Sequence, residues 1–250
     1  MVFEHLLDPV FAPLLNLPTL LAVIILSFLI SLIVTILYKF TTNQSLMKDL
    51  KQEMKDFQKQ IKELRNEPQK AMEVQKKAMQ TNLKYMSHSM KSTLYSILPI
   101  IIIFSWMGAN FAYEPISPGQ EFTTAVYFEK GYSGKIELSA PKGIAISGNA
   151  TKEVSDGAVK WVLKGGEGEY LMEYIYDGKT QTKELLISKN KYTQPIKNVN
   201  DGLIKYIEIE HKEKKLLNLH IFGWELGWLW TYILFSIASS IVIRKVIKVY

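Results

Sequence analysis

The sequence predicts a membrane protein with three transmembrane helices, a cytoplasmic antiparallel coiled-coil hairpin and an extracytoplasmic all-β, sandwich-like domain. Three observations lead to this fold class. Long apolar runs within residues 18–38, 94–113 and 218–243 have the length that a helix needs to cross a bilayer. A polar segment at residues 39–93 carries apolar residues at the three- and four-residue spacing of a coiled coil. Residues 114–217 change to the period-two pattern of β-strands.

Residues 1–17 precede the first crossing and contain no Lys or Arg, whereas a cleavable signal peptide begins with a positively charged region. Their apolar residues follow a helical spacing that Pro9 and Pro13 interrupt. We therefore expect one or two short helices that lie in the extracytoplasmic membrane interface and anchor the chain there.

The expected hairpin has one apolar seam in each arm. The seam of the first arm has spacings of 3, 4, 3, 4 and 3 and consists of Met47, Leu50, Met54, Phe57, Ile61 and Leu64. Asn66-Glu67-Pro68 breaks this pattern, because Asn caps helices and Pro fits the first turn of a new one. The second seam consists of Met72, Met79, Leu83, Met86 and Met90. Two such arms, each roughly 35–40 Å long, are expected to pack antiparallel.

The five residues of the second seam have two interpretations. They form the core of the hairpin, or they form a surface that contacts clients or a targeting factor. The second interpretation rests on the side chain of Met, which is unbranched and polarisable and is common on surfaces that accept varied apolar partners. The sequence leaves both open.

The excess positive charge lies in the hairpin. Residues 39–91 hold 12 Lys or Arg against 6 Asp or Glu, which accounts for the whole formal charge of +6. A basic segment of this kind is typical of a protein that binds nucleic acid or of the cytoplasmic side of a membrane protein, and the adjacent apolar runs favour the membrane protein. The tail at residues 244–250 is also basic. The positive-inside rule therefore places hairpin and tail in the cytoplasm, and the N-terminus and β domain outside, in a multi-pass cell-membrane protein.

Seven segments of the β domain alternate apolar and polar residues and are rich in β-branched and aromatic types: residues 121–129, 135–140, 143–147, 159–163, 170–176, 182–187 and 203–210. Asp177-Gly178 predicts a type I′ hairpin turn, and Asp156-Gly157 marks another turn. This pattern is typical of a small sandwich of the immunoglobulin kind, here without the family disulfide because the chain has no Cys.

Hydroxyl side chains gather at the centre or in the cytoplasmic halves of the three crossings: Ser27, Ser31, Thr35, Ser96, Ser236, Ser239 and Ser240. Such residues commonly mediate helix packing. The alternative is a shallow hydrated groove that they line and that opens to the cytoplasm. No Asp, Glu, Lys, Arg or His is buried inside a crossing, which disfavours a transporter or channel.

The order of segments resembles the archaeal YidC-like proteins of the YidC/Oxa/Alb insertase superfamily. It consists of an outside N-terminus, one crossing, a cytoplasmic coiled-coil hairpin and two further crossings that end in GWLWTYILFSIASSIVIRKVIKVY at residues 227–250. The resemblance covers residues 1–113 and 216–250, and the external β domain is not part of the core fold. Bacterial members place an Arg in their groove, whereas Arg65 and Arg244 here lie outside the crossings.

The resemblance implies a membrane insertase and chaperone rather than an enzyme. Its groove between three helices would receive apolar client segments from the cytoplasm and release them to lipid. The implied partners are membrane protein clients, the lipid bilayer, a ribosome with its nascent chain or a targeting factor at the basic hairpin, and a second small membrane subunit. The sequence suggests no cofactor and no metal.

The runner-up function belongs to another class. It is a structural or receptor-like membrane protein that acts through its external β domain. Asn149-Ala150-Thr151 is a glycosylation sequon on an expected external loop, and Asn43-Gln44-Ser45 is another on the cytoplasmic side. Only Asn149 is therefore a candidate for glycosylation.

Overall fold

The computed structural model describes residues 7–154, 157–219 and 223–249. The chain divides into two compact units, each with its own internal packing. The membrane unit comprises residues 1–106 and 216–250, and the β unit comprises residues 107–215.

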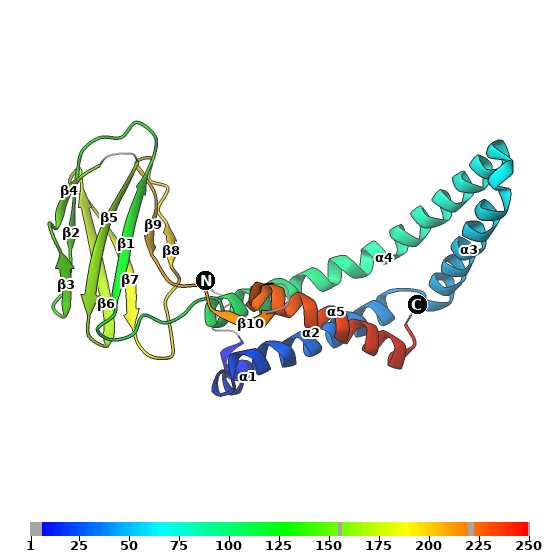
Figure 1. Ribbon diagram of the computed structural model, residues 1–250, viewed down its shortest axis with the longest axis horizontal. Helices are drawn as coiled ribbons and strands as arrows, with labels where there is room; N and C mark the ends of the chain where they lie inside the picture. Colours follow the sequence, from blue (N-terminus) through cyan, green and yellow to red (C-terminus); the bar gives the residue numbers. More distant parts are fainter. Residues whose placement is uncertain (1–6, 155–156, 220–222, 250) are drawn as a thin grey trace. The chain divides into compact units, whose positions relative to one another are not determined.

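The membrane unit is built mainly from helices (Figure 1). In chain order its elements are α1 (Asp8–Phe11), η1 (Ala12–Asn16), α2 (Thr19–Thr41), α3 (Gln44–Glu63), η2 (Leu64–Asn66), α4 (Pro68–Phe111), β10 (Lys215–Leu219), β11 (Trp224–Gly227) and α5 (Trp228–Ile247). The last turn of α4, from residue 107 onward, belongs to the β unit. Within the described residues, α2, α4 and α5 are long and apolar enough to cross a membrane. This confirms the three expected crossings.

Helix α4 joins two elements that were expected to be separate, the second hairpin arm and the second crossing. It begins at Pro68, as expected, and continues for 44 residues with Pro99 inside it. The other arm, α3, is capped by Asn43, whose Oδ1 accepts a hydrogen bond from the N–H of Leu46 at 3.2 Å. A single helix therefore runs from the tip of the hairpin into the second crossing (Figure 1).

Helix α5 ends at Ile247, four residues beyond the expected end of the third crossing. Arg244 and Lys245 consequently lie in its last turn, where their charge complements the negative end of the helix dipole. The first part of the expected range 218–243, the interfacial lead-in to the third crossing, is not helical, because β10 and β11 pair as a two-stranded sheet just before α5. Residues 220–222, which belong to the expected range 218–243, lie outside the described residues.

The segment before α2 contains the two short helices that its Pro-interrupted pattern predicts. Its contact with α4 is made by Trp106, which is fully buried. The indole Nε1 donates a hydrogen bond to Oδ1 of Asp8 at 2.8 Å, and the ring of Phe11 meets the indole edge-on at 5.2 Å. The N-terminal segment is thus packed against α4, and its position in the membrane interface stays a prediction.

The β unit is a sandwich of two antiparallel sheets with the strand orders β3-β5-β1-β9-β8 and β4-β2-β6-β7 (Figure 1). The strands are β1 (Glu121–Phe128), β2 (Lys135–Ser139), β3 (Ile144–Ser147), β4 (Thr151–Glu153), β5 (Ala158–Gly165), β6 (Gly168–Tyr176), β7 (Lys179–Ile187), β8 (Ile196–Asn198) and β9 (Ile204–Ile209). Seven of them correspond to the predicted strands. Strands β4 and β8 were not predicted, because three residues are too few to establish a period.

The turn between β6 and β7 confirms the predicted I′ hairpin. Asp177 and Gly178 have φ values of 46° and 71°, and a type I′ turn requires positive φ at both central residues. The pairing on either side begins with Tyr176 opposite Lys179. Of the second predicted turn, Asp156 lies outside the described residues.

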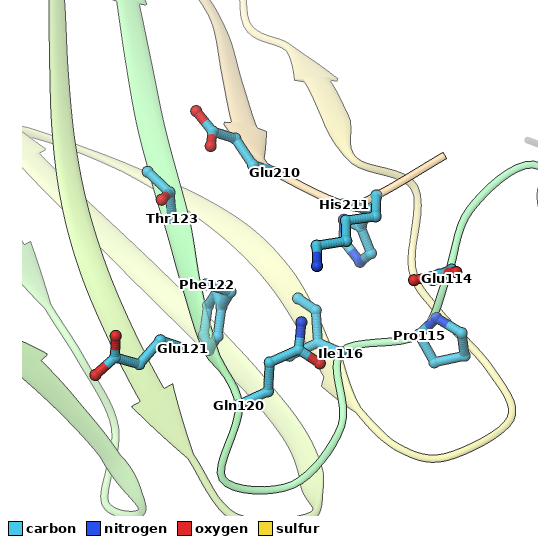
Figure 2. A pocket seen from close by; sticks show the side chains of 10 residues that line it. Glu114, Pro115, Ile116, Gln120, Glu121, Phe122, Thr123, Glu210 and His211 are labelled. Atoms are coloured by element: carbon cyan, nitrogen blue, oxygen red, sulfur yellow. The ribbon is translucent and has the colours of Figure 1, made fainter. Parts of the chain in front are cut away.

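The chain enters and leaves the β unit at one pole through two short paired segments, residues 112–114 and 212–214, which we call the stem. Tyr113 bridges to Glu213, the N–H of Glu114 donates to the carbonyl of Lys212 at 2.8 Å, and the N–H of Lys214 donates to the carbonyl of Ala112 at 2.9 Å. A cavity of about 230 Å³ lies beside the stem (Figure 2).

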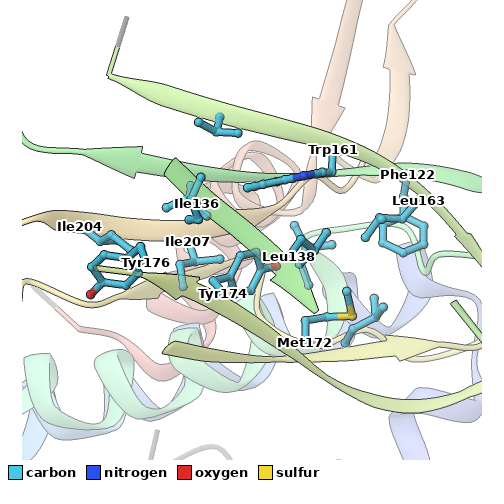
Figure 3. Packing of buried hydrophobic residues seen from close by; sticks show 14 of the residues in the cluster. Phe122, Ile136, Leu138, Trp161, Leu163, Met172, Tyr174, Tyr176, Ile204 and Ile207 are labelled. Atoms are coloured by element: carbon cyan, nitrogen blue, oxygen red, sulfur yellow. The ribbon is translucent and has the colours of Figure 1, made fainter. Parts of the chain in front are cut away.

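The core of the β unit lies between the two sheets (Figure 3). Trp161 on β5 and Tyr174 on β6 are fully buried, and their polar atoms are satisfied. The indole Nε1 of Trp161 donates to the carbonyl of Ala150 at 2.9 Å, and the hydroxyl groups of Tyr174 and Thr124 are hydrogen-bonded at 2.6 Å. A core of this kind holds the sandwich without a disulfide.

Candidate functional site

Two of the expected groove residues join α2 to α5. The hydroxyl of Ser31 donates to the carbonyl of Ser236 at 3.2 Å. The hydroxyl of Ser27 lies 2.7 Å from the carbonyl of Val23 and 3.4 Å from that of Tyr232. Both serines are buried, and α2 and α5 pack along each other. At these positions the hydroxyls serve helix packing, which was one of the two interpretations.

The other expected groove residues bond within their own helices or lie partly open. Thr35 donates to the carbonyl of Ser31 at 2.7 Å, and Ser96 donates to that of Ser92 at 3.0 Å; both side chains are buried. Ser236 donates to the carbonyl of Ile233 at 2.9 Å and is half-buried. Ser239 and Ser240 are also half-buried. Their association in one hydrated groove stays a prediction.

Sequence reasoning missed a buried hydroxyl on α4. Ser92 is almost fully buried, and its Oγ has no hydrogen-bond partner among the described residues. It lies one turn before Ser96 on the same face of α4. The sequence signal for it was the spacing of four residues between Ser92 and Ser96, which places both on one helix face. A buried hydroxyl without a partner favours a site that admits water or a ligand.

A second missed feature lies where α2 and α5 end. The guanidinium carbon of Arg244 stands 5.2 Å from the centre of the Tyr38 ring, within the range of a cation–π contact. Lys39 donates through Nζ to the carbonyl of Ile247 at 3.3 Å, which caps the C-terminus of α5. Both cations are therefore held at the end of the helix pair.

The apolar stripe of the second hairpin arm faces outward. Its members are exposed by 70, 60, 58, 48 and 59 %, in the order Met72, Met79, Leu83, Met86 and Met90. The hairpin-core interpretation of these residues is therefore wrong. The less exposed face of this arm lies about half a turn away and contains Ala71, Val74, Ala78 and Thr81. We call the five exposed residues the methionine stripe.

The methionine stripe continues into the second crossing without a break. Leu94, Ile97 and Ile101 occupy the same face of α4 at spacings of 4, 3 and 4 from Met90, and they are exposed by 66, 43 and 58 %. From Met72 to Ile101 this apolar face extends about 44 Å along one helix. It joins the polar, basic part of α4 to the part that is apolar enough to cross a membrane.

The cavity in the β unit has an apolar floor and a polar rim. Ile116 and Phe122 are buried at its floor, and the rim includes Glu114, Glu121 and His211 (Figure 2). Within the described residues, no group of three or more His, Asp or Glu is placed to hold a metal ion. The glycosylation candidate Asn149 lies elsewhere in the unit, exposed between β3 and β4.

Comparison with known proteins identifies a family that the chain matches. Residues 4–129 match the family described as integral membrane protein EMC3/TMCO1-like. The match includes α2, α3 and α4, and thus the methionine stripe and the serines of the first two crossings. No curated protein and no solved structure matches the chain.

Proposed function

Because the chain belongs to the EMC3/TMCO1-like family of integral membrane proteins, part of the Oxa1/YidC insertase superfamily, we propose that it inserts apolar segments of client proteins into the membrane. Members of this family are insertases and chaperones rather than catalytic enzymes. Within the superfamily we propose that the chain belongs to the archaeal YidC-like branch, because of the order of its three long apolar helices and the polar helical hairpin between the first two.

The methionine stripe carries this proposal. It is an exposed apolar face on a basic helix, and an isolated face of this size is unfavourable in water unless a partner covers it. Met side chains adapt to apolar partners of different shape, as clients of one insertase require. A client segment of about 20 residues is about 30 Å long and fits on the apolar face of about 44 Å that the stripe forms together with Leu94, Ile97 and Ile101.

The proposed mechanism lowers a desolvation barrier. The polar flank of a client must cross hydrocarbon, where each unsatisfied backbone group costs several kcal/mol. A hydrated groove lined by Ser27, Ser31, Thr35, Ser96, Ser236, Ser239 and Ser240 would shorten that path. Ser27 and Ser31 would hold α2 to α5, and the remaining hydroxyls, with Ser92, would offer hydrogen bonds to the flank.

The proposed orientation follows from charge. Hairpin and C-terminus face the cytoplasm, and the N-terminus and the β unit face outside. The lysines of the same arm, Lys70, Lys76, Lys77, Lys84 and Lys91, would meet the ribosome of a nascent chain or a targeting factor. A second small membrane subunit would cover part of the lipid-facing helix surface.

A reconstituted system tests the function. Purified protein in liposomes should bring the transmembrane segment of a small client to a protease-protected position, whereas liposomes without it should not. If insertion is equally efficient in empty liposomes, the proposed function is wrong.

Cysteine reactivity tests the groove separately, because the chain has no native Cys to react. Thr35→Cys and Ser236→Cys should react with a small water-soluble thiol reagent added from the cytoplasmic side. Phe28→Cys is the matched control, since Phe28 is an exposed side chain in the apolar part of α2. If all three react equally slowly, the site is dry and the hydrated groove does not exist.

The alternative function is a receptor-like or structural role of the β unit. It is favoured by the cavity of about 230 Å³ beside the stem, which offers the β unit a place to bind a ligand. Deletion of residues 117–209 separates the two functions. An insertase should keep its binding to clients, whereas a receptor that acts through the β unit should lose its function entirely.

A further inference from the structure

The end of α4 is completed by a side chain from the β unit. In an α-helix the N–H of residue 112 would bond to the carbonyl of residue 108. Here the hydroxyl of Tyr192 lies between the two groups. It donates to the carbonyl of Gly108 at 2.7 Å and accepts from the N–H of Ala112 at 2.9 Å. The phenol therefore takes the place of the next backbone hydrogen bond, and α4 ends at Phe111.

The ring of Tyr192 is held in an aromatic cluster at the stem. Its centre lies 5.7 Å from that of Tyr113, in an edge-to-face arrangement, and 6.0 Å from that of His211. His211 is fixed through Nδ1, which lies 2.8 Å from the carbonyl of Ile209. Burial lowers the pKa of His211, so the imidazole is neutral at pH 7 and the cluster carries no charge there.

The loop that presents Tyr192, residues 188–195, is tied to the outer edge of β7. Lys183 donates through Nζ to the carbonyl of Gln194, and Thr193 donates to the carbonyl of Glu184 at 3.4 Å. Lys183 is only 5 % exposed, and burial lowers its pKa to about 8. Burial of an amine is unfavourable unless it is hydrogen-bonded, so the bond to Gln194 ties the end of the loop next to Tyr192 to β7.

We propose that residues 188–195 form a latch through which the β unit controls the last turn of α4. While Tyr192 bridges Gly108 and Ala112, the helix end and the sandwich form one body. When the loop leaves β7, Tyr192 withdraws and the last turn of α4 frays. The latch lies wholly within residues 107–215 and does not depend on the insertase function.

Hydrogen exchange, resolved to single amides on the full-length protein in lipid nanodiscs, tests the latch. Tyr192→Phe keeps the ring and removes the bridge, so the Ala112 amide should exchange about tenfold faster. Tyr113→Phe is the matched control: it removes a neighbouring hydroxyl that is not part of the bridge, and Ala112 should exchange as in the parent. Unchanged exchange of Ala112 in Tyr192→Phe would overturn the proposal.

A second variant tests whether the loop 188–195 controls the end of α4, beyond the local cap that Tyr192 provides. Lys183→Met keeps the length of the buried side chain and removes the tie to Gln194 without changing Tyr192 or α4. Faster exchange of both the loop and the Ala112 amide is the result expected of a latch. If Lys183→Met speeds exchange in the loop alone, Tyr192 is a local cap and the β unit does not control the helix end.

Discussion

Replacing methionines of the stripe by a polar residue tests whether the stripe is a binding surface or part of a packed core. We choose Met79→Gln with Met86→Gln, because Gln has nearly the length and the helix propensity of Met. Met47→Gln is the matched control on α3, where the side chain is fully buried. The three side chains share one chemistry and differ in exposure, with values of 60, 48 and 0 % for Met79, Met86 and Met47.

The magnitudes follow from these exposures. Full burial of a Met side chain is worth about 1.5–3 kcal/mol, and roughly half of each stripe residue is already in water. Each stripe replacement should therefore reduce the free energy of unfolding by about 1 kcal/mol at most. Met47→Gln buries an amide in an apolar site and should reduce it by about 3–5 kcal/mol.

The affinity for a client helix should fall in the stripe variants, although their stability changes little. A client helix that covers the exposed halves of Met79 and Met86 gains about 2 kcal/mol from them, which is about thirtyfold in Kd. The assay is anisotropy of a labelled apolar helical peptide, beside chemical unfolding followed by circular dichroism at 222 nm. Two results would refute the reasoning: unfolding of the double variant as early as Met47→Gln, or unchanged peptide affinity in a stable double variant.

Three further predictions concern other parts of the chain. Burial lowers the pKa of Lys183 to about 8, against 10.5 for the free side chain, so between these pH values the unfolded chain binds a proton that the folded chain has released. The free energy of unfolding should therefore rise by up to about 3 kcal/mol between about pH 8 and 10.5. Urea unfolding of the β unit measures this rise, which should be absent in Lys183→Met. Ser31→Ala should weaken the α2–α5 contact by under about 1 kcal/mol in thermal unfolding in detergent, and a loss of several kcal/mol would show that the hydroxyl does more than pack helices. In a host that glycosylates, mass spectrometry should find glycan on Asn149 and none on Asn43, and glycan on Asn43 would reverse the proposed orientation.

Patterns confined to neighbouring residues were predictable from the sequence. An uncharged run of 20 residues has few alternatives to a crossing, and Pro68 fits the first turn of a helix, where its missing N–H costs nothing. Asp177-Gly178 is readable for the same reason, because positive φ at two successive residues requires these types. In each case the physical cause acts over a few residues.

Features that depend on distant parts of the chain were not predictable. The spacing of Met72 and Met79 identifies an apolar face, yet spacing alone does not say whether another helix covers it. The small side chains Ala71 and Ala78 carry too weak an apolar signal to mark the less exposed face of the same arm. The bridge from Tyr192 to Ala112 joins residues 80 positions apart, and no local pattern records it.

Photo-crosslinking from α4 tests the central claim, that the methionine stripe receives clients, most directly. A photoreactive amino acid replaces Met86 or, as the matched control, His88, which is also exposed but points about 200° away around the helix. Each variant is illuminated with an arrested ribosome–nascent chain that carries one transmembrane segment. We predict strong crosslinks from position 86 and few from position 88. Equal crosslinking from both positions, or stronger crosslinking from position 88, would contradict the claim.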